Sequence, residues 1–598
     1  MSKDIEFVTN LKNDIELDIK KIVNKLDTNA LIKFILIMFE NELFSPSNLA
    51  IQSSLFSKED IAEELSYVIS LKVNTLNKKI SLGKVINADY SKFTKKYHEK
   101  LNSLLELLRA RSIVREIEIY ITKQGYKLST KDNIISVEHP IKNFKHYYQM
   151  GYLRNTLENI TIGLNVHNNG SMKFENIFDM LNNHLLDSMP ILNYEIRSEG
   201  TAKETIIFTI DARGIANLHR FLTDEHDMRY NQISSKYLEY IDVNISDNCT
   251  KTGNLKWIDL LNFSIVLQYL ITYMNKVIDE KSTSPRMKIN SRLLLFTNTQ
   301  KNEFILEILQ TINPTIIQKD VQAFLSKFST SLDKSEGRID LQFQPIVKVK
   351  EHSFILFNTF TMVDMVRAYI KNYNIALDDQ GKKFEGVVYG KFSKNFNQAY
   401  FGIKYLDETK KKGEIDICII GDKHIYFIEC KNNLHPVSAS SASTNYKNFL
   451  KAIDQVEQAE NYFNLNRVDF LKKHLQLKIE DIEEYTLHKV VIKSNRNIAG
   501  LNYKGISFRD IYSLDKLLGD GCIKEYSQMP GENQKLEKII YMHENKKFFQ
   551  EIDFINYLSE KSIYFQVLNN LIKKAYNEVN YKEYIIRDSI YAFDIFNK

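Results

Sequence analysis

The chain has 598 residues, of which 43% are apolar and 26% charged, and its formal net charge is +5. One hydrophobic core rarely serves a chain of this length, so the sequence predicts a multidomain globular protein and argues against a largely disordered one. The 80 basic residues are nearly balanced by 75 acidic ones. Net charge therefore does not by itself indicate a nucleic-acid binder, and any phosphate-binding surface must be a local concentration of charge.

The four cysteines, Cys249, Cys418, Cys430 and Cys522, include no CxxC pair. This spacing argues against both a disulfide framework and a zinc site. The N-terminal sequence MSKDIEF lacks the apolar core of a signal peptide, and the apolar stretch at residues 34–39 is too short for a bilayer, which needs about 20 residues. We therefore expect a cytoplasmic protein without a membrane partner.

The first half of the chain divides into three predicted parts. Residues 1–125 place apolar side chains at three- and four-residue spacing, which predicts a helical N-terminal domain whose stripes serve core packing. Residues 126–338 are expected to form a mixed α/β domain of unknown role, with a strand at 205–212 and a long buried helix at 257–278. Residues 339–380 are expected to form a hairpin and helix connector.

The pattern changes after residue 380. A helical segment at 384–392 is followed by a strand at 399–406. The sequence GEIDICIIGDKHIYFIECK (413–431) then reads as two strands joined by a tight Gly-Asp-Lys turn, which is a hairpin signal. A polar stretch at 435–445 is expected to be a long loop.

The end of the chain is expected to be a linker at 519–534 followed by a helical C-terminal appendix at 535–598, suited to packing or oligomer contacts. The fold class expected is therefore multidomain α+β. It combines a helical N-terminal region, a mixed α/β middle region, an α/β core after residue 380, and the helical appendix.

Three charged residues of the predicted hairpin are placed so that they can meet. Asp416 lies between Ile415 and Ile417 and is expected to point away from their side of the sheet, whereas Glu429 and Lys431 share a face because they are two residues apart. Pairing of the hairpin brings Asp416 close to both. Two carboxylates suit Mg²⁺, which prefers hard oxygen ligands, and a neighbouring lysine suits a metal-activated water.

An Asp on one strand and Glu-x-Lys on the next resemble the motif of the PD-(D/E)xK nuclease superfamily. The GEID and IECKN sequences are especially similar to its nuclease-related (NERD-type) and restriction-endonuclease-like members. The resemblance covers about residues 381–515, and the restriction-endonuclease-like domain that it implies runs over 381–518. It leaves the polar stretch at 435–445 without a counterpart.

The resemblance also implies roles for particular residues. Glu385, on the preceding helix, matches the carboxylate that such proteins often add to Asp416 and Glu429 in holding the metal, and Lys431 would assist the attacking water. A Gln on the following helix often positions the nucleophile. The segment KAIDQVEQAENYF offers two candidates, which the sequence leaves open, Gln455 and Gln458.

The function expected on these grounds is that of an Mg²⁺-dependent endonuclease acting on DNA, with Mn²⁺ as a substitute metal, in restriction or anti-phage defence. The alternatives are an RNA-directed nuclease and a catalytically inactive nucleic-acid-binding or scaffold protein. Self-association, or a protein partner bound through the N-terminal domains, is also open. Lys404 and the run 410–412 either follow phosphates near the site or form a solvated turn.

Overall fold

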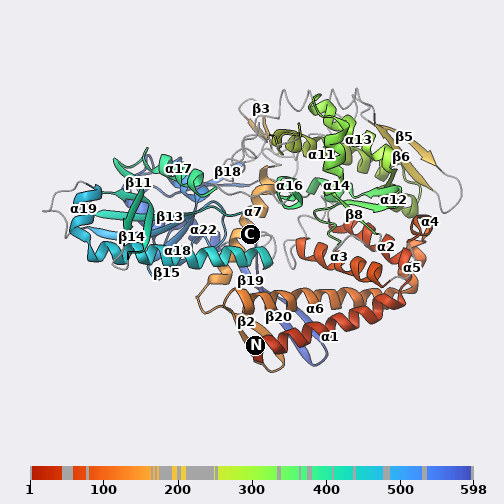
Figure 1. Ribbon diagram of the computed structural model, residues 1–598, viewed down its shortest axis with the longest axis horizontal. Helices are drawn as coiled ribbons and strands as arrows, with labels where there is room; N and C mark the ends of the chain where they lie inside the picture. Colours follow the sequence, from red (N-terminus) through yellow and green to blue (C-terminus); the bar gives the residue numbers. More distant parts are fainter. Residues whose placement is uncertain are drawn as a thin grey trace.

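The structure is a computed structural model, and it confirms a multidomain α+β protein with a helical N-terminal region and several mixed sheets (Figure 1). No helix among the residues that it describes is long and apolar enough to cross a membrane. The described residues run from 3 to 593 with gaps at 44–57, 76–79, 163–165, 169–170, 174–191, 198–203, 211–247, 250–252, 333–338, 363–364, 374–379, 407–409, 435–438, 476–484, 528–534 and 571.

The N-terminal region is helical, as its apolar spacing predicts. The long helices α1 and α6 lie side by side, and α1 turns one stripe of side chains inward at three- and four-residue spacing. The stripe consists of Val8, Leu11, Ile15, Ile19 and Val23. The elements are α1 (Lys3–Lys25), α2 (Thr28–Ile37), the π-helix η1 (Met38–Leu43), α3 (Lys58–Asn74), α4 (Leu82–Asn87), α5 (Tyr90–Lys96) and α6 (His98–Lys123).

One sheet joins the two strands that follow α6 to the strands β19 and β20 near residue 590. Its strand order is β1-β2-β20-β19, and β2 runs parallel to β20 with Ile134 opposite Ile585. The strands are β1 (Lys127–Lys131), β2 (Ile134–Glu138), β19 (Ile572–Tyr581) and β20 (Tyr584–Phe593). The helical appendix expected at 535–598 is therefore corrected. It holds the helices α21 (Glu551–Leu558) and α22 (Ile563–Asn570), but it begins with β18 (Lys535–Tyr541) and ends in the β19–β20 hairpin.

The C-terminal segment forms strands because its buried side chains alternate with exposed ones, as in a β-strand, and do not follow helical spacing. Val579 and Tyr581 are buried on alternate positions of β19, and Ile586 of β20 joins them in the cluster that contains side chains of α6. The connecting turn places Lys582 at a φ of 51° and lacks the Asn-Gly signature that marks a hairpin in sequence.

The middle region contains the expected strand as β6 (Thr205–Ile210), paired with β5 (Leu192–Arg197), and the expected helix as α11 (Trp257–Lys281). The predicted hairpin is β9 (Ile346–Val349) and β10 (His352–Ile355), and it lies inside a four-stranded sheet of order β7-β10-β9-β8. The remaining elements are β3 (Val166–Asn168), β4 (Ser171–Lys173), α12 (Pro285–Arg292), β7 (Leu294–Thr297), α13 (Asn298–Ile312), α14 (Gln318–Lys327), β8 (Ser329–Ser331), α15 (Phe357–Met362) and α16 (Met365–Tyr373).

The segment after residue 380 forms a six-stranded mixed sheet of order β11-β12-β13-β14-β16-β15. Strands β13, β14 and β16 are parallel, and the other pairs are antiparallel. Side chains of α17 and α20 pack on one face, and α18 packs on the other. The elements are α17 (Gln380–Phe392), β11 (Gln398–Leu406), β12 (Lys412–Ile420), β13 (His424–Lys431), α18 (Ala439–Leu465), α19 (Arg467–Leu475), β14 (Thr486–Lys493), β15 (Asn502–Tyr503), β16 (Ile506–Asp510), α20 (Ile511–Leu518) and β17 (Cys522–Ser527).

The loop expected at 435–445 is wrong from Ala439 onward, where α18 begins, and residues 435–438 lie outside the described part of the chain. Helix α7 (Phe144–Ile162) lies between the N-terminal region and the six-stranded sheet (Figure 1). Its Arg154 forms a buried ion pair with Asp510, at the end of β16, with an N–O distance of 3.0 Å. The α/β segment is thus anchored to the rest of the chain through α7.

Candidate active site

The six-stranded sheet divides at Asp416. The ladder between β12 and β13 runs only from the pair Ile420–Ile425 to the pair Ile417–Ile428. Beyond this point β12 remains paired with β11 alone, and β13 remains paired with β14 as far as Lys431 and Lys493. Asp416 is the first residue of β12 past the division, which we call the fork.

Side-chain alternation also breaks at the fork. Ile417 belongs to the apolar cluster with α17, whereas Ile415 belongs to the cluster with α18. The expectation that these two isoleucines share one side of the sheet is therefore wrong. The residue across from Asp416 in the β11–β12 register is Gly402, which makes no pair with it and has a φ of 66°. A glycine in the left-handed region is typical of a strand irregularity that redirects a side chain.

The fork brings three of the predicted residues together. Asp416 is 7% exposed, and its Oδ2 accepts a hydrogen bond from the backbone N–H of Cys430 at 2.7 Å. Glu429, 4% exposed, accepts a hydrogen bond from the ammonium group of Lys431. Extending the register by one step from Ile417–Ile428 places Asp416 opposite Glu429. The convergence expected from the hairpin is thus present in the structure.

Helix α18 supplies one of the two candidate glutamines. Lys431 Nζ donates to Gln455 Oε1 at 2.8 Å, and it makes no hydrogen bond with Gln458. Of the two candidates, Gln455 is therefore the one that contacts Lys431, because the rotation of α18 directs it toward β13. Lys431 is held between Glu429 of its own strand and Gln455, which fixes the position of its ammonium group.

The pKa values of the three carboxyl groups are raised, chiefly by burial. Burial raises the pKa of Asp416 to about 6, although the Cys430 N–H and the charge of Lys431 lower it. Burial, and then the neighbouring Asp416, raise the pKa of Glu429 to about 7. Glu385 of α17 lies close enough to respond as well, since burial and then Asp416 raise its pKa to about 7. A bound cation would relieve the shared repulsion.

The donor set fits a metal held by few protein ligands. Asp416 Oδ1 and Glu429 Oε2 accept no hydrogen bond from any residue that the structure describes, which leaves their lone pairs for a ligand. Within the same residues, no three His, Cys, Asp or Glu side chains are gathered as a metal cluster. The arrangement therefore suits the mode in which Mg²⁺ binds one or two carboxylates and completes its shell with waters and phosphate oxygens. Glu385, expected as a third metal ligand, does not join such a cluster among the described residues, although its charge raises the pKa of Glu429.

Two neighbouring residues escaped the sequence analysis. Gly402 interrupts the strand sequence AYFGIKYL, and an isolated glycine in a strand is a recognised signal of a bulge. Glu414 is exposed on β12, and its charge raises the pKa values of Glu385 and Asp416. Lys404 pairs with Glu414 in the register of β11 and β12 and is also exposed.

The polar residues that follow β13 and those that follow β14 are hydrogen-bonded to each other. Ser494 donates its backbone N–H to Lys431 O at 3.0 Å, and its hydroxyl accepts from the Asn433 N–H at 2.9 Å. At Gly151, where an added Cβ would lie 2.2 Å from the backbone oxygen of Arg496, helix α7 presses on the turn that follows β14. The direction of the chain just after Lys431 is therefore fixed by the turn and by α7.

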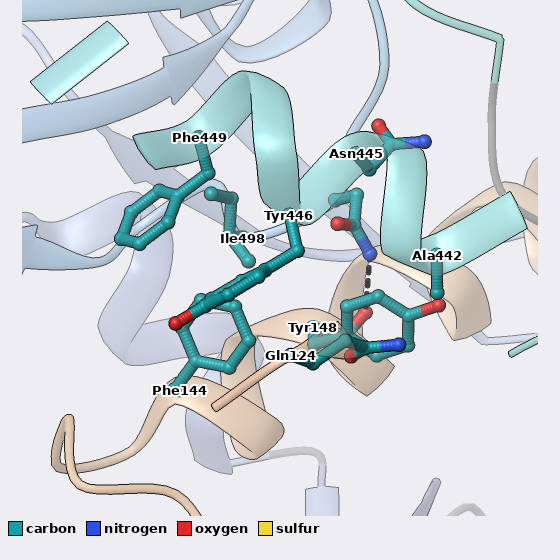
Figure 2. Close-up of a pocket in the computed structure, with 9 residues that line it drawn as sticks. Gln124, Phe144, Tyr148, Ala442, Asn445, Tyr446, Phe449 and Ile498 are labelled. Atoms are coloured by element: carbon teal, nitrogen blue, oxygen red, sulfur yellow. Dashed lines mark hydrogen bonds between the residues drawn. The ribbon is translucent and has the colours of Figure 1, made fainter. Parts of the chain in front are cut away.

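Figure 2 shows the second contact between this region and the N-terminal part, at the start of α18. Tyr446 packs edge-on against Phe144, with ring centroids 5.5 Å apart, and Phe449 lies against the same ring. Asn497 donates to the backbone oxygen of Tyr148 at 3.2 Å. Side chains fill this pocket, so it serves packing rather than ligand binding.

Comparisons of the chain with protein-family models, with curated proteins and with solved structures found no match. The assignment of a function therefore has to come from the geometry of the residues themselves.

Proposed function

We propose that residues 381–518 form a metal-dependent nuclease of the PD-(D/E)xK kind that hydrolyses phosphodiester bonds of DNA, as an endonuclease. The observation that carries the proposal is the fork, where Asp416 of one strand meets Glu429 and Lys431 of the next. The order of elements supports it, because a helix, three antiparallel strands, two helices and a strand parallel to β13 follow one another from α17 to β14.

Each residue has a distinct part in the proposed reaction. Asp416 and Glu429 hold Mg²⁺, or Mn²⁺ in its place, and Glu385 adds negative charge from α17. The metal, when bound, supplies a Lewis acid for the phosphate and an acidified water. Lys431 orients the attacking water and neutralises charge that develops on the phosphate as the bond to the leaving oxygen breaks. Gln455 holds the Lys431 ammonium group in place.

The raised pKa values of the carboxyl groups also support a cation site over a structural ion pair. An exposed ion pair between Glu429 and Lys431 would leave the pKa of Glu429 low, whereas burial and Asp416 raise it to about 7. Raised carboxyl pKa values next to a held lysine are typical of functional sites. We extend the proposal to restriction or anti-phage defence, with the N-terminal regions recognising a target or a partner, by analogy with multidomain nucleases.

The test uses matched DNA and RNA strands incubated with wild-type protein and with Lys431→Met, in Mg²⁺ and in EDTA. Metal-dependent cleavage of DNA that is lost in Lys431→Met supports the proposal. Cleavage of RNA alone would show that the substrate is RNA rather than DNA. Nucleic-acid binding without cleavage in any metal supports the inactive scaffold instead.

A further inference from the structure

An aromatic pair lies at the surface beside the fork. Phe401 of β11 is 46% exposed, and the ring of Tyr389 of α17 packs against it with centroids 5.4 Å apart and planes inclined by 60°. The Tyr389 hydroxyl donates to the backbone oxygen of Ala399 at 3.4 Å. One ring is thus tethered to the strand, and it supports a second ring that stays open to solvent.

The pair is continuous with the candidate site. Phe401 lies opposite Ile417 in the β11–β12 register, and Ile417 is the last residue of β12 that pairs with β13 next to the fork at Asp416. Tyr389 follows Glu385 by one turn of α17. A molecule whose phosphate reaches the carboxylates therefore passes the aromatic pair.

Helix α17 carries two glycines next to the pair, and the space beside both of them is open. Gly386 and Gly390 are one turn apart in the helix, and a Cβ added at either would meet nothing within 4 Å. Glycine destabilises a helix interior relative to alanine, and no neighbour in the described chain requires these positions to be small. The two glycines leave room beside Tyr389 for a bound molecule to approach the helix backbone closely.

We propose that Tyr389 and Phe401 form a stacking platform for an unpaired base, so that the substrate of the site is single-stranded or locally unpaired nucleic acid. The inference rests on the proposed nuclease function. Aromatic platforms beside basic residues are how proteins hold single strands without reading their sequence. Two exposed lysines supply the positive charge, Lys404 on the same strand and Lys382 on α17, whose charge reaches Glu385.

The size of the exposed surface favours a base over a protein partner. A stable protein–protein contact buries about 800 Å² on each side, whereas one half-exposed ring on a tethered neighbour matches a single base. In a fully paired duplex each base is stacked between its neighbours and does not offer a free face. The platform therefore selects for strands with at least one unstacked base near the scissile phosphate.

The test measures binding by fluorescence anisotropy in EDTA, so that cleavage plays no part. Labelled single-stranded DNA and the matching duplex are titrated with full-length wild-type protein, Phe401→Ala, Phe401→Trp and Leu406→Ala. Phe401→Ala should weaken single-strand binding roughly tenfold, the loss of one stacked base, and leave duplex binding unchanged. Phe401→Trp should retain binding. Leu406, 57% exposed on the same strand, is the matched apolar control and should have no effect.

A second variant separates substrate approach from folding. Gly390→Ala adds a methyl group into open space and raises helix propensity, so its melting temperature should equal or exceed that of wild type while single-strand binding weakens. Wild-type binding of single strands by Phe401→Ala overturns the platform. Full single-strand binding by Phe401→Leu also overturns it, because apolar contact without ring stacking would then suffice.

Failure of the inference and failure of the proposed function give different results. Metal-dependent cleavage of duplex DNA that is indifferent to Phe401→Ala supports the nuclease and overturns the platform. Single-strand binding that depends on Phe401 but is never followed by cleavage supports the platform and contradicts the nuclease.

Discussion

The carboxylate of Asp416 bridges two strands that have stopped pairing, because its Oδ2 accepts the backbone N–H of Cys430 at 2.7 Å. This hydrogen bond takes the place of the next rung of the β12–β13 ladder. It holds Asp416 beside Glu429 while leaving the other oxygen of each carboxylate without a hydrogen-bond donor among the described residues. Local strand separation is therefore what converts a buried hairpin into a candidate metal site.

Replacing Glu429 with Gln should stabilise the metal-free protein at high pH. The carboxyl pKa is 4.5 without the fold and about 7 within it, so the folded state binds the proton more tightly. The stability that this proton provides is complete below pH 4.5 and is lost as the pH rises through 7. In EDTA, thermal unfolding should show Glu429→Gln melting above wild type at pH 8, with the difference shrinking toward pH 5. A difference independent of pH would contradict the raised pKa of Glu429, which burial and then Asp416 cause.

Mg²⁺ should stabilise the wild-type protein, and more so at pH 8 than at pH 5.5. The carboxylates must lose their protons to bind a cation, and the pKa values of about 6 for Asp416 and about 7 for Glu429 place this step between the two conditions. Thermal unfolding with 10-fold steps of Mg²⁺ measures the shift. Asp416→Asn keeps an oxygen for the Cys430 N–H but lacks the charge, so its melting temperature should not respond. An equal response in the variant would place the metal elsewhere.

Gln455→Ala should reduce metal-dependent cleavage about 10- to 100-fold, as is typical of a residue that positions a functional group. The reason is that the Lys431 ammonium group loses one of its two side-chain partners. Because Gln455 acts through Lys431, the pH profile of kcat should shift along with its height. Gln458→Ala is the matched control on the same helix and should retain the wild-type rate and profile. Equal losses in both variants would point to a defect of α18 itself.

Gly151→Ala should destabilise the protein by about 1–3 kcal/mol, the cost of overpacking. The added Cβ would lie 2.2 Å from the Arg496 backbone oxygen, so α7 has to move away from the turn that follows β14. Chemical denaturation followed by circular dichroism measures the loss. Gly83→Ala, in α4, adds a methyl group with nothing within 4 Å and should be neutral or stabilising. Loss of stability in Gly83→Ala alone would contradict the packing argument.

Local patterns account for what could be predicted from the sequence. Apolar spacing in α1 and alternation in the β12–β13 hairpin depend on neighbouring residues, so both were readable, and the hairpin turn was enough to place Asp416 near Glu429. The pairing of β20 with β2 places Ile585 opposite Ile134, far away in the sequence, and no pattern of neighbouring residues predicts such a long-range pairing.

The finer features of the site depend on contacts between distant elements. The break in alternation at Asp416 involves Gly402 on the neighbouring strand. The contact of Lys431 with Gln455 rather than Gln458 depends on how α18 is rotated over β13, because the two glutamines are three residues apart and lie on one helical face. The sequence therefore predicted that Asp416, Glu429 and Lys431 come together, and only the packed sheet decided their geometry.

The most direct test of the central claim is plasmid cleavage by wild-type protein, Asp416→Asn and Asp422→Asn, each with Mg²⁺, with Mn²⁺ and with EDTA. Asp422 is an exposed carboxylate at the far end of the same hairpin, so its replacement controls for a change of charge. The account predicts metal-dependent cleavage by wild type and Asp422→Asn that is lost in Asp416→Asn. Cleavage by Asp416→Asn at the wild-type rate would contradict it.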